Sequence, residues 1–332
     1  MKPPAHAPEF LASCGWKDAE ILPLAGDASF RRYFRVVNGD RSAVLMDAPP
    51  PHEDPRPFIA VAEWLASVGL SAPPILARDL ERGLLLLGDF GDWRLREFLD
   101  EDPRRELGLY ELATDVLIHL HLHPPMPGLK PHGLDQWLEE LKLFIDWYCP
   151  AVGAEVDKQG YLAAWTEVLE PVAADGLGPV TVLRDYHAEN VMLVDGREGV
   201  ERFGLLDFQD ALAGHPAYDL VSLLQDARVT VPVDLEAELF AIYCAEVAAR
   251  EPAFDREAFA AAYADFGAQR NTRLLGLWLR LLKRDGKPHY VQNIPRTWGY
   301  LARNLRATAL GDLAAWYERH FPVDLRTGRL PG

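Results

Sequence analysis

The residues best suited to chemistry are two carboxylates and an amide that follow one another closely in the middle of the chain. Asp185 and Asn190 stand five positions apart, and Asp207 ends the next apolar run. A carboxylate at the first position could orient and deprotonate an attacking hydroxyl group. The oxygens of the other two side chains are the hard ligands that Mg²⁺ prefers. This combination indicates phosphoryl transfer, with Asp185 as the base and Asn190 and Asp207 as the metal ligands.

Two short apolar segments separate the metal ligands. Residues 191–194 and 203–206 are typical of strands, and residues 195–197 between them are typical of a turn. Such a hairpin would return Asp207 to the level of Asn190. A lone Asp–Asn pair at this spacing is usually a turn or a cap, so the second Asp in register carries the argument.

This stretch resembles the catalytic loop of the aminoglycoside phosphotransferase-like kinases, which typically reads His-Gly-Asp-x-His-x-x-Asn. Three residues match that pattern: Asp185, His187 and Asn190. Two depart from it: Leu183 and Arg184. Residues 214–220 match the family's Gly-x-Pro-x-x-Asp-Leu, and the resemblance implies that Asp219 braces the catalytic loop while His187 fixes its geometry beside the substrate.

The resemblance implies an α+β, bilobal protein-kinase-like fold. Its small N-lobe of mixed β structure would cover residues 1–90, and its larger, mainly helical C-lobe would cover residues 91–332. The local patterns agree with this division. Strands are expected at residues 21–24, 32–37, 42–46 and 84–87, with a hairpin signal at Asn38-Gly39. The proline-rich residues 49–57 should block regular structure, and Phe58, Ala62, Leu65 and Ala66 should form the apolar face of a helix.

ATP would bind at the loop of residues 26–32 and at a hinge near Gly88–Asp92. The candidate nucleotide-binding residues are Gly26, Asp27, Ser29, Arg31, Arg32, Asp89 and Phe90. Kinases of this class carry a Lys on the third strand for the phosphates, whereas Met46 is the closest match here. We expect an arginine among Arg31, Arg32 and Arg35 to replace it, although the same residues could form a solvated strand face.

Further motifs resemble one branch of the family, the bacterial anomeric sugar kinases of peptidoglycan recycling. The segments concerned are residues 26–35, 44–50, 185–187, 206–211, 284–288 and 294–296. The branch implies ATP- and Mg²⁺-dependent phosphorylation of N-acetylmuramate and N-acetylglucosamine at the anomeric hydroxyl, giving the α-1-phosphates. We also expect a cytoplasmic enzyme, because the three distant cysteines are typical of buried thiols in a reducing compartment, and we expect it to be a monomer.

A basic run lies near the C-terminus. Between Gln269 and Ala307 there are nine basic residues and one acid, Asp285, within a chain of net charge −16. The run could be a solvated helix face or could line the acceptor site. In the second interpretation Arg270, Arg280 and Arg284 are the leading candidates to contact the lactyl carboxylate of N-acetylmuramate, because an anion beside acidic groups needs a cation.

The composition restricts the classes of partner that the protein can bind. The net charge of −16 argues against nucleic acid and anionic membranes, and the three distant cysteines form no disulfide or metal motif. Two alternatives stay open. A small-alcohol or aminoglycoside kinase of the same fold would need a carboxylate-lined pocket for a cationic substrate. A nucleotide-binding pseudokinase would explain the missing Lys, but not the retention of Asp185, Asn190 and Asp207.

Overall fold

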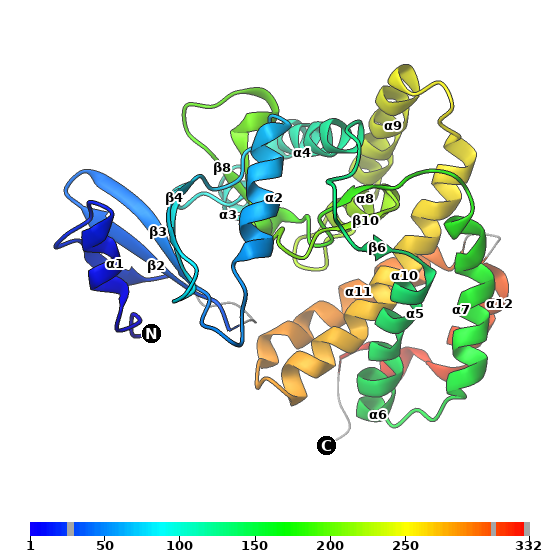
Figure 1. Ribbon diagram of the computed structural model, residues 1–332. Coiled ribbons are helices and arrows are strands. Elements are labelled where there is room, and N and C mark those ends of the chain that lie inside the picture. Colours follow the sequence, from blue (N-terminus) through cyan, green and yellow to red (C-terminus); the bar gives the residue numbers. More distant parts are fainter. Residues whose placement is uncertain (25–29, 307–309, 329–332) are drawn as a thin grey trace. The chain divides into compact units, whose positions relative to one another are not determined.

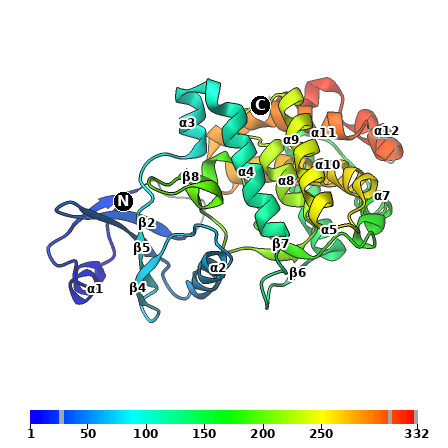
Figure 2. The same cartoon turned by 90° about the horizontal axis from the view of Figure 1, so that it is seen from above.

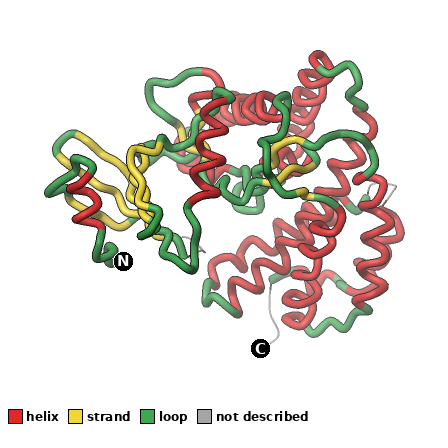
Figure 3. Tube along the Cα trace, in the orientation of Figure 1, coloured by secondary structure: helices red, strands yellow, loops and turns green. Residues whose placement is uncertain are grey.

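The computed structural model describes residues 1–24, 30–306 and 310–328. The chain forms two compact units, Met1–Leu112 with Glu189–Ala211, and Ala113–Ala188 with Leu212–Gly332. The longest strands belong to the first unit, and the second is mostly helical (Figure 3). The lobe boundary expected near residue 90 stays a prediction. Among the described residues, no helix is both long enough and apolar enough to cross a membrane.

The first unit is built on an antiparallel sheet, in which Figure 1 labels β2, β3 and β4. The strand order is β1-β2-β3-β5-β4. Its strands are β1 (Glu20–Pro23), β2 (Arg32–Asn38), β3 (Arg41–Asp47), β4 (Ile75–Asp79) and β5 (Leu84–Gly88). The four strands expected from the sequence are confirmed, and β4 is additional. The Asn38-Gly39 signal is also confirmed, because Asn38 pairs with Arg41 across a two-residue turn.

One face of this sheet forms a core with helix α1 (Ala7–Ser13). Phe34, Leu45 and Leu86 are register partners on neighbouring strands, so their side chains share a face. All three are fully buried in a cluster with Phe10 and Leu11 of α1. The alternation of the strands thus fixes which face packs against the helix.

Helix α2 (Arg56–Ser67) follows the proline-rich segment. It begins before Pro57, so the expectation that regular structure is blocked through that residue was wrong. Proline is tolerated in the first turn of a helix, where its missing N–H has no intrahelical partner. The expected apolar face is confirmed at Phe58, Ala62 and Leu65, whereas Ala66 is exposed.

A second antiparallel pair carries the metal-ligand candidates. It consists of β8 (Val191–Leu193) and β9 (Phe203–Leu205), as expected. Bridges from Ser71 to Gly204 and from Arg94 to Met192 attach the pair to the first unit. Helix α3 (Leu95–Glu101) follows Arg94 directly.

The second unit is a helical assembly with a small three-stranded sheet. The sheet has the order β6 (Pro131–His132), β10 (Leu212–Gly214), β7 (Val180–Val182). Helix α4 (Glu106–His121) begins in the chain range of the first unit. The other helices are α5 (Leu134–Leu143), α6 (Cys149–Val152), α7 (Lys158–Ala173), α8 (Ala217–Leu224), α9 (Val233–Arg250), α10 (Arg256–Lys283), α11 (Ile294–Asn304) and α12 (Gly311–His320).

Helix α10 is the central element of this unit and packs against α5, α8 and α11 (Figures 1 and 2). Its N-terminus is capped by Asp255, whose carboxylate accepts the N–H groups of Glu257 and Ala258. At Gly276 the helix approaches the chain at the end of α5 very closely, since a Cβ there would lie 2.2 Å from the carbonyl carbon of Leu143. This contact fixes α10 against α5, and both helices carry charged residues of the candidate site.

Candidate active site

The loop that carries Asp185 is held by Asp219, a fully buried residue of α8. One carboxylate oxygen of Asp219 accepts the Leu183 N–H at 2.6 Å, and the other accepts the Arg184 N–H at 2.8 Å. Hydrogen bonds to a carboxylate are stronger than neutral ones. They fix the backbone immediately before Asp185, which is the bracing contact that the family motif implied for Asp219.

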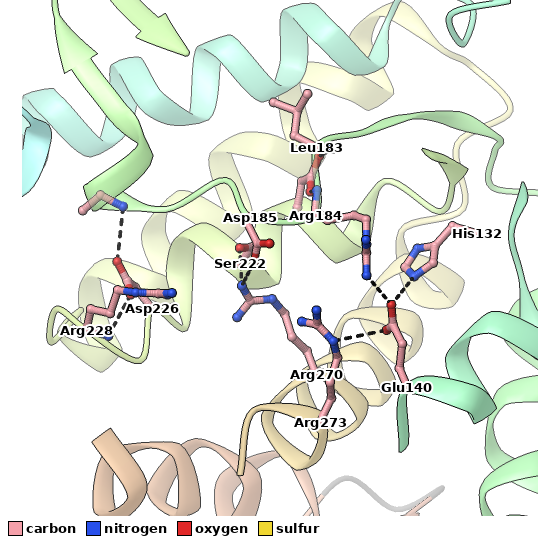
Figure 4. A network of polar contacts seen from close by, with 12 residues as sticks. His132, Glu140, Leu183, Arg184, Asp185, Ser222, Asp226, Arg228, Arg270 and Arg273 are labelled. Carbon is pink, nitrogen blue, oxygen red and sulfur yellow. Dashed lines mark hydrogen bonds and ion pairs between the residues drawn. The ribbon is translucent and has the colours of Figure 1, made fainter. Parts of the chain in front are cut away.

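Arg184 occupies the loop position where the family pattern has Gly. Its φ of 71° lies in the left-handed region, which explains the preference for Gly and makes an Arg costly there. The guanidinium group donates a hydrogen bond at 2.6 Å to Glu140 of α5 (Figure 4). The departure from the family pattern therefore adds a tie between the catalytic loop and α5.

Glu140 is buried and gathers several donors around its carboxylate. Gln269 donates a hydrogen bond at 3.3 Å, Arg273 lies 3.7 Å away and His132 lies 3.6 Å away. Burial alone would raise the pKa of Glu140, but Arg273, His132 and Arg184 outweigh it and hold that pKa well below its usual range. Glu140 is thus a fixed negative charge that positions the surrounding cations.

Asp185 is surrounded by positive charge within the second unit. Nη2 of Arg270 lies 3.6 Å from Oδ1 of Asp185 and donates a hydrogen bond at 2.7 Å to the hydroxyl of Ser222 (Figure 4). Burial raises the pKa of Asp185, but Arg273 and Arg270 outweigh it and lower the pKa to about 2. The carboxylate is therefore ionised at neutral pH, as a catalytic base must be.

His187 is buried two residues after Asp185, and its pKa lies well below the usual value because burial and Arg228 both disfavour the cation. A neutral imidazole is consistent with a role in loop geometry. The next residue along the loop, Ala188, donates its N–H at 3.2 Å to Asp226, which also accepts the Arg228 N–H at 2.8 Å.

Sequence reasoning included Arg273 in the basic run but not among its leading candidates, and it missed four other residues of this cluster: Glu140, Ser222, Asp226 and Arg228. Arg273 follows Arg270 by one helical turn in the same basic run, so helical periodicity could have found it. The others come from distant segments and carry no local signal.

The metal-ligand candidates lie together at one end of the β8–β9 pair, in the first unit. The Leu206 N–H donates a hydrogen bond at 2.9 Å to the Asn190 carbonyl, which holds the segments before β8 and after β9 side by side. Asp207 has a φ of 57°, another left-handed conformation at a non-glycine residue. Strained backbone of this kind is concentrated at functional sites.

The donor chemistry of this pair fits Mg²⁺. One amide oxygen and one carboxylate are hard ligands, and Mg²⁺ at phosphate sites usually takes one or two protein ligands while nucleotide phosphates and water supply the rest. Among the described residues, no group of three His, Cys, Asp or Glu side chains could hold a metal by itself. The two-ligand arrangement at Asn190 and Asp207 is consistent with a metal that arrives with a nucleotide.

The candidate phosphate-binding arginines are all engaged by acids within the first unit. Nε of Arg32 donates a hydrogen bond at 2.8 Å to Asp47, and Arg35 forms ion pairs with Asp89 at 2.7 Å and Asp92 at 2.6 Å. The strand position that carries Lys in related kinases is closed, because Met46 is fully buried. Gly26, Asp27 and Ser29 lie outside the described residues.

Arg31 differs from its neighbours in facing the metal-ligand end of the unit. It forms ion pairs with Glu53 at 3.2 Å and with Asp210 at 4.0 Å, three residues after Asp207. Burial lowers the pKa of Arg31, but several acids, Asp207 among them, outweigh it and raise that pKa. This arginine is the best placed of the three to act beside the metal ligands.

The hinge candidates are packed within the first unit. Asp89 accepts the Gly91 N–H at 2.9 Å in addition to its contact with Arg35. The ring of Phe90 lies close to Gly204 of β9, where a Cβ would approach it to 2.4 Å. These contacts order the hinge, and the nucleotide-binding role of both residues stays a prediction.

The predicted acceptor residues of the basic run occupy different environments. Arg270 belongs to the cluster around Asp185, with 1% of its surface exposed. Arg280 is half-buried, whereas the Arg284 side chain is 54% exposed and pairs with Asp285 at 2.7 Å. The structure therefore brings only the first of them to the base directly.

The chain belongs to the phosphotransferase enzyme family, whose model matches residues 20–261. The N-acetylmuramate/N-acetylglucosamine kinase of Caulobacter vibrioides is 38% identical, over 96% of both chains. The kinase of that name from Pseudomonas aeruginosa is 38% identical, over 93% of this chain and 92% of its own. The one from Neisseria meningitidis is 35% identical, over 91% and 90%.

Solved structures show the fold. A choline/ethanolamine kinase family protein from Mesorhizobium loti superposes with a TM-score of 0.61 at 17% identity, over 93% of this chain and 97% of its own. The choline kinase LicA from Streptococcus pneumoniae superposes with a TM-score of 0.61 at 12% identity, over 92% and 98%. The expected α+β kinase fold, with an N-terminal antiparallel sheet and a mostly helical remainder, is confirmed.

Proposed function

We propose that this protein transfers the γ-phosphoryl group of ATP to the anomeric hydroxyl of N-acetylmuramate and N-acetylglucosamine, forming the α-1-phosphates. Relatives 35–38% identical over nearly their whole lengths bear the name N-acetylmuramate/N-acetylglucosamine kinase, which supports the two acceptor sugars. LicA, which shares the fold with a TM-score of 0.59, has been solved in complex with AMP. The observation that carries the proposal is the cationic surrounding of Asp185, with Arg270 3.6 Å from its carboxylate.

In this proposal Asp185 acts as the general base. As the bond between the sugar O1 and the γ-phosphorus forms, the bond from that phosphorus to the leaving oxygen of ADP breaks, and the O1 proton passes to the Asp185 carboxylate. The weak basicity expected from a pKa of about 2 suits this step. An anomeric hydroxyl is more acidic than an ordinary alcohol, and the loose transition state of phosphoryl transfer demands little of the base.

Asn190 and Asp207 would hold the Mg²⁺ that neutralises charge on the ATP phosphates when bound. Arg31 would supply the positive charge that a third-strand Lys gives in related kinases. Its planar guanidinium offers a fork of donors that suits phosphate oxygens. The ion pairs of Arg31 with Glu53 and Asp210 support this role, because they hold the side chain at the metal-ligand end of its unit.

The surroundings of Asp185 also weigh against an aminoglycoside kinase. A polycationic acceptor would meet Arg270 and Arg273 near the base, at a cost in repulsion. A pseudokinase is disfavoured for a different reason, because Asp219 makes two hydrogen bonds that order the loop before Asp185. An inactive nucleotide-binding protein would gain nothing from that arrangement.

The test is an incubation of the purified protein with MgATP and a panel of acceptors, followed by mass spectrometry of the products. The panel contains both N-acetylated sugars, glucosamine, kanamycin and choline. We expect sugar monophosphates from the N-acetylated sugars. Phosphorylated kanamycin or choline without any sugar phosphate would replace the proposal with the alternative acceptor class.

A further inference from the structure

Four arginines of the basic run lie in α10 or just after it. They fall into two groups according to the contacts of their guanidinium groups. Arg270 is occupied by Ser222 and Asp185, and Arg284 lies largely in solvent beside Asp285. Arg273 and Arg280 remain. Nη1 of Arg273 and Nε of Arg280 are buried donors with no hydrogen-bond partner among the described residues. Nε of Arg270 is a buried donor of the same kind, but the Nη2 of that residue is already held by Ser222 and Asp185.

These two arginines stand two helical turns apart. A spacing of seven residues places side chains on the same face of a helix, with their Cα atoms roughly 10 Å apart along the axis. Burial lowers the pKa of Arg280, and the charges of Arg284 and Arg273 lower it further. Like charges on one helix face repel each other, and Asp285 offsets this repulsion only in part at Arg280. An anion bound between Arg273 and Arg280 would relieve the repulsion that remains.

Glu140 does not serve as that anion for the free edge of Arg273. The carboxylate lies 3.7 Å from Nε of Arg273 and also accepts hydrogen bonds from Arg184 and Gln269. Figure 4 shows Arg273 between Glu140 and Arg270, with Glu140 on the Nε side. Glu140 thus orients the guanidinium group, and Nη1 is left for a ligand.

We propose that Arg273 and Arg280 form a subsite for a carboxylate carried by the acceptor, which in the proposed function is the lactyl carboxylate of N-acetylmuramate. This inference rests on the proposed function and adds the residues that distinguish the acidic sugar from the neutral one. It keeps Arg280 from the expectation drawn from the sequence and adds Arg273. It leaves out Arg270, which contacts Asp185, and Arg284, whose side chain is 54% exposed.

The position of Arg273 supports the assignment. Arg273 stands one helical turn after Arg270, whose Nη2 lies 3.6 Å from Oδ1 of Asp185, and the positive charge of Arg273 favours the ionised form of that carboxylate. A carboxylate there would remain within the reach of a sugar whose anomeric hydroxyl contacts Asp185. N-acetylglucosamine, which has no carboxylate, would leave the buried donors of Arg273 and Arg280 to water.

The experiment compares kcat/KM for N-acetylmuramate, its uncharged methyl ester and N-acetylglucosamine in R280Q. The matched control is R284Q, at the residue that directly follows α10. The wild-type enzyme should favour the acid over the ester. R280Q should lose roughly 10- to 100-fold with N-acetylmuramate, the range expected for one charge-assisted hydrogen bond, and keep its rates with the ester and N-acetylglucosamine. R284Q should leave all three values unchanged.

R273K is the second variant. It keeps a positive charge beside Glu140 but removes the forked donor of the guanidinium group, so it should lose activity selectively with N-acetylmuramate. Equal losses for all three sugars in R280Q and R273K, with wild-type melting temperatures, would overturn the subsite. A wild-type enzyme that phosphorylates neither sugar would instead refute the proposed function. In that event the subsite is tested by calorimetric titration of N-acetylmuramate into wild type and R280Q. Equal affinities of the two proteins for this sugar would overturn the subsite.

Discussion

Arg184 donates a hydrogen bond at 2.6 Å to Glu140, although its own backbone has a left-handed φ of 71°. A β-carbon in that conformation is unfavourable, so the loop retains a cost that Gly would avoid. The buried carboxylate of Glu140 offsets the cost by tying the catalytic loop to α5, and through Arg273 to α10. Residues from three segments of the second unit are thereby held in one geometry around Asp185.

We predict that E140Q destabilises the protein by about 3–5 kcal/mol, because it leaves Arg184 and Arg273 without a buried counter-charge. The neighbouring E139Q is the matched control. Glu139 is exposed and pairs with Lys142 one turn away, so its change should cost less than about 0.5 kcal/mol. Urea unfolding of both variants measures the difference. Equal midpoints would show that the Glu140 cluster contributes little to stability.

The pH dependence of catalysis should reflect the lowered pKa of Asp185. A carboxylate with a pKa of about 2 is ionised at every higher pH, so protonation of this base should not reduce kcat/KM between about pH 4 and 7. In R270Q one of the charges that lowers this pKa is lost, and the pKa should rise. The acidic limb of the profile should then move to higher pH.

R250Q serves as the control for that profile, because Arg250 is exposed and forms an ion pair with Glu246 of its own helix. Its profile should match the wild type. An acidic limb that stays at the same pH in R270Q would mean that Arg270 does not tune the base.

Asp207 should be required for the metal dependence of the reaction. D207A removes one of two proposed Mg²⁺ ligands, and we expect loss of turnover together with loss of the Mg²⁺ dependence of nucleotide affinity. Titrations of ATP into wild type and D207A at several Mg²⁺ concentrations make the measurement. Identical titrations would assign Asp207 a purely structural role.

Arg31 should contribute to ATP binding in place of the missing Lys. R31A should raise the KM for ATP by roughly 10- to 100-fold, as expected for loss of a charge-assisted contact. R56A is the control, because Arg56 is exposed and pairs with Asp54 beside it. If both variants keep the wild-type KM, another group must meet the phosphates.

The sequence predicted those parts of the fold that local patterns encode. Alternation and the Asn38-Gly39 turn indicated β2 and β3, and the catalytic motif indicated the bracing role of Asp219. Strand β4 escaped notice because its burial alternates only between half-buried and exposed positions. The role of Glu140 could not be predicted, since it depends on contacts with Arg184 and Arg273, which are far away in the sequence.

The arginines near the phosphate loop show another limit of the sequence. Arg32 and Arg35 are basic and adjacent to the loop, so composition gave them the same standing as Arg31. Their partners, Asp47 and Asp89, become apparent only once strand register is known. Once the strand register is known, Arg32 and Arg35 are seen to pair with acids of the sheet region, whereas Arg31 faces the metal-ligand candidates.

The most direct test of the central claim is ³¹P NMR of the product formed from N-acetylglucosamine and MgATP by wild type and D185N. The account predicts an α-linked phosphate on C1 from the wild-type enzyme. D185N should form the same product with turnover lower by about 10²- to 10⁴-fold, while ATP binding persists. A phosphate on any other hydroxyl, or near-normal turnover in D185N, would contradict the account.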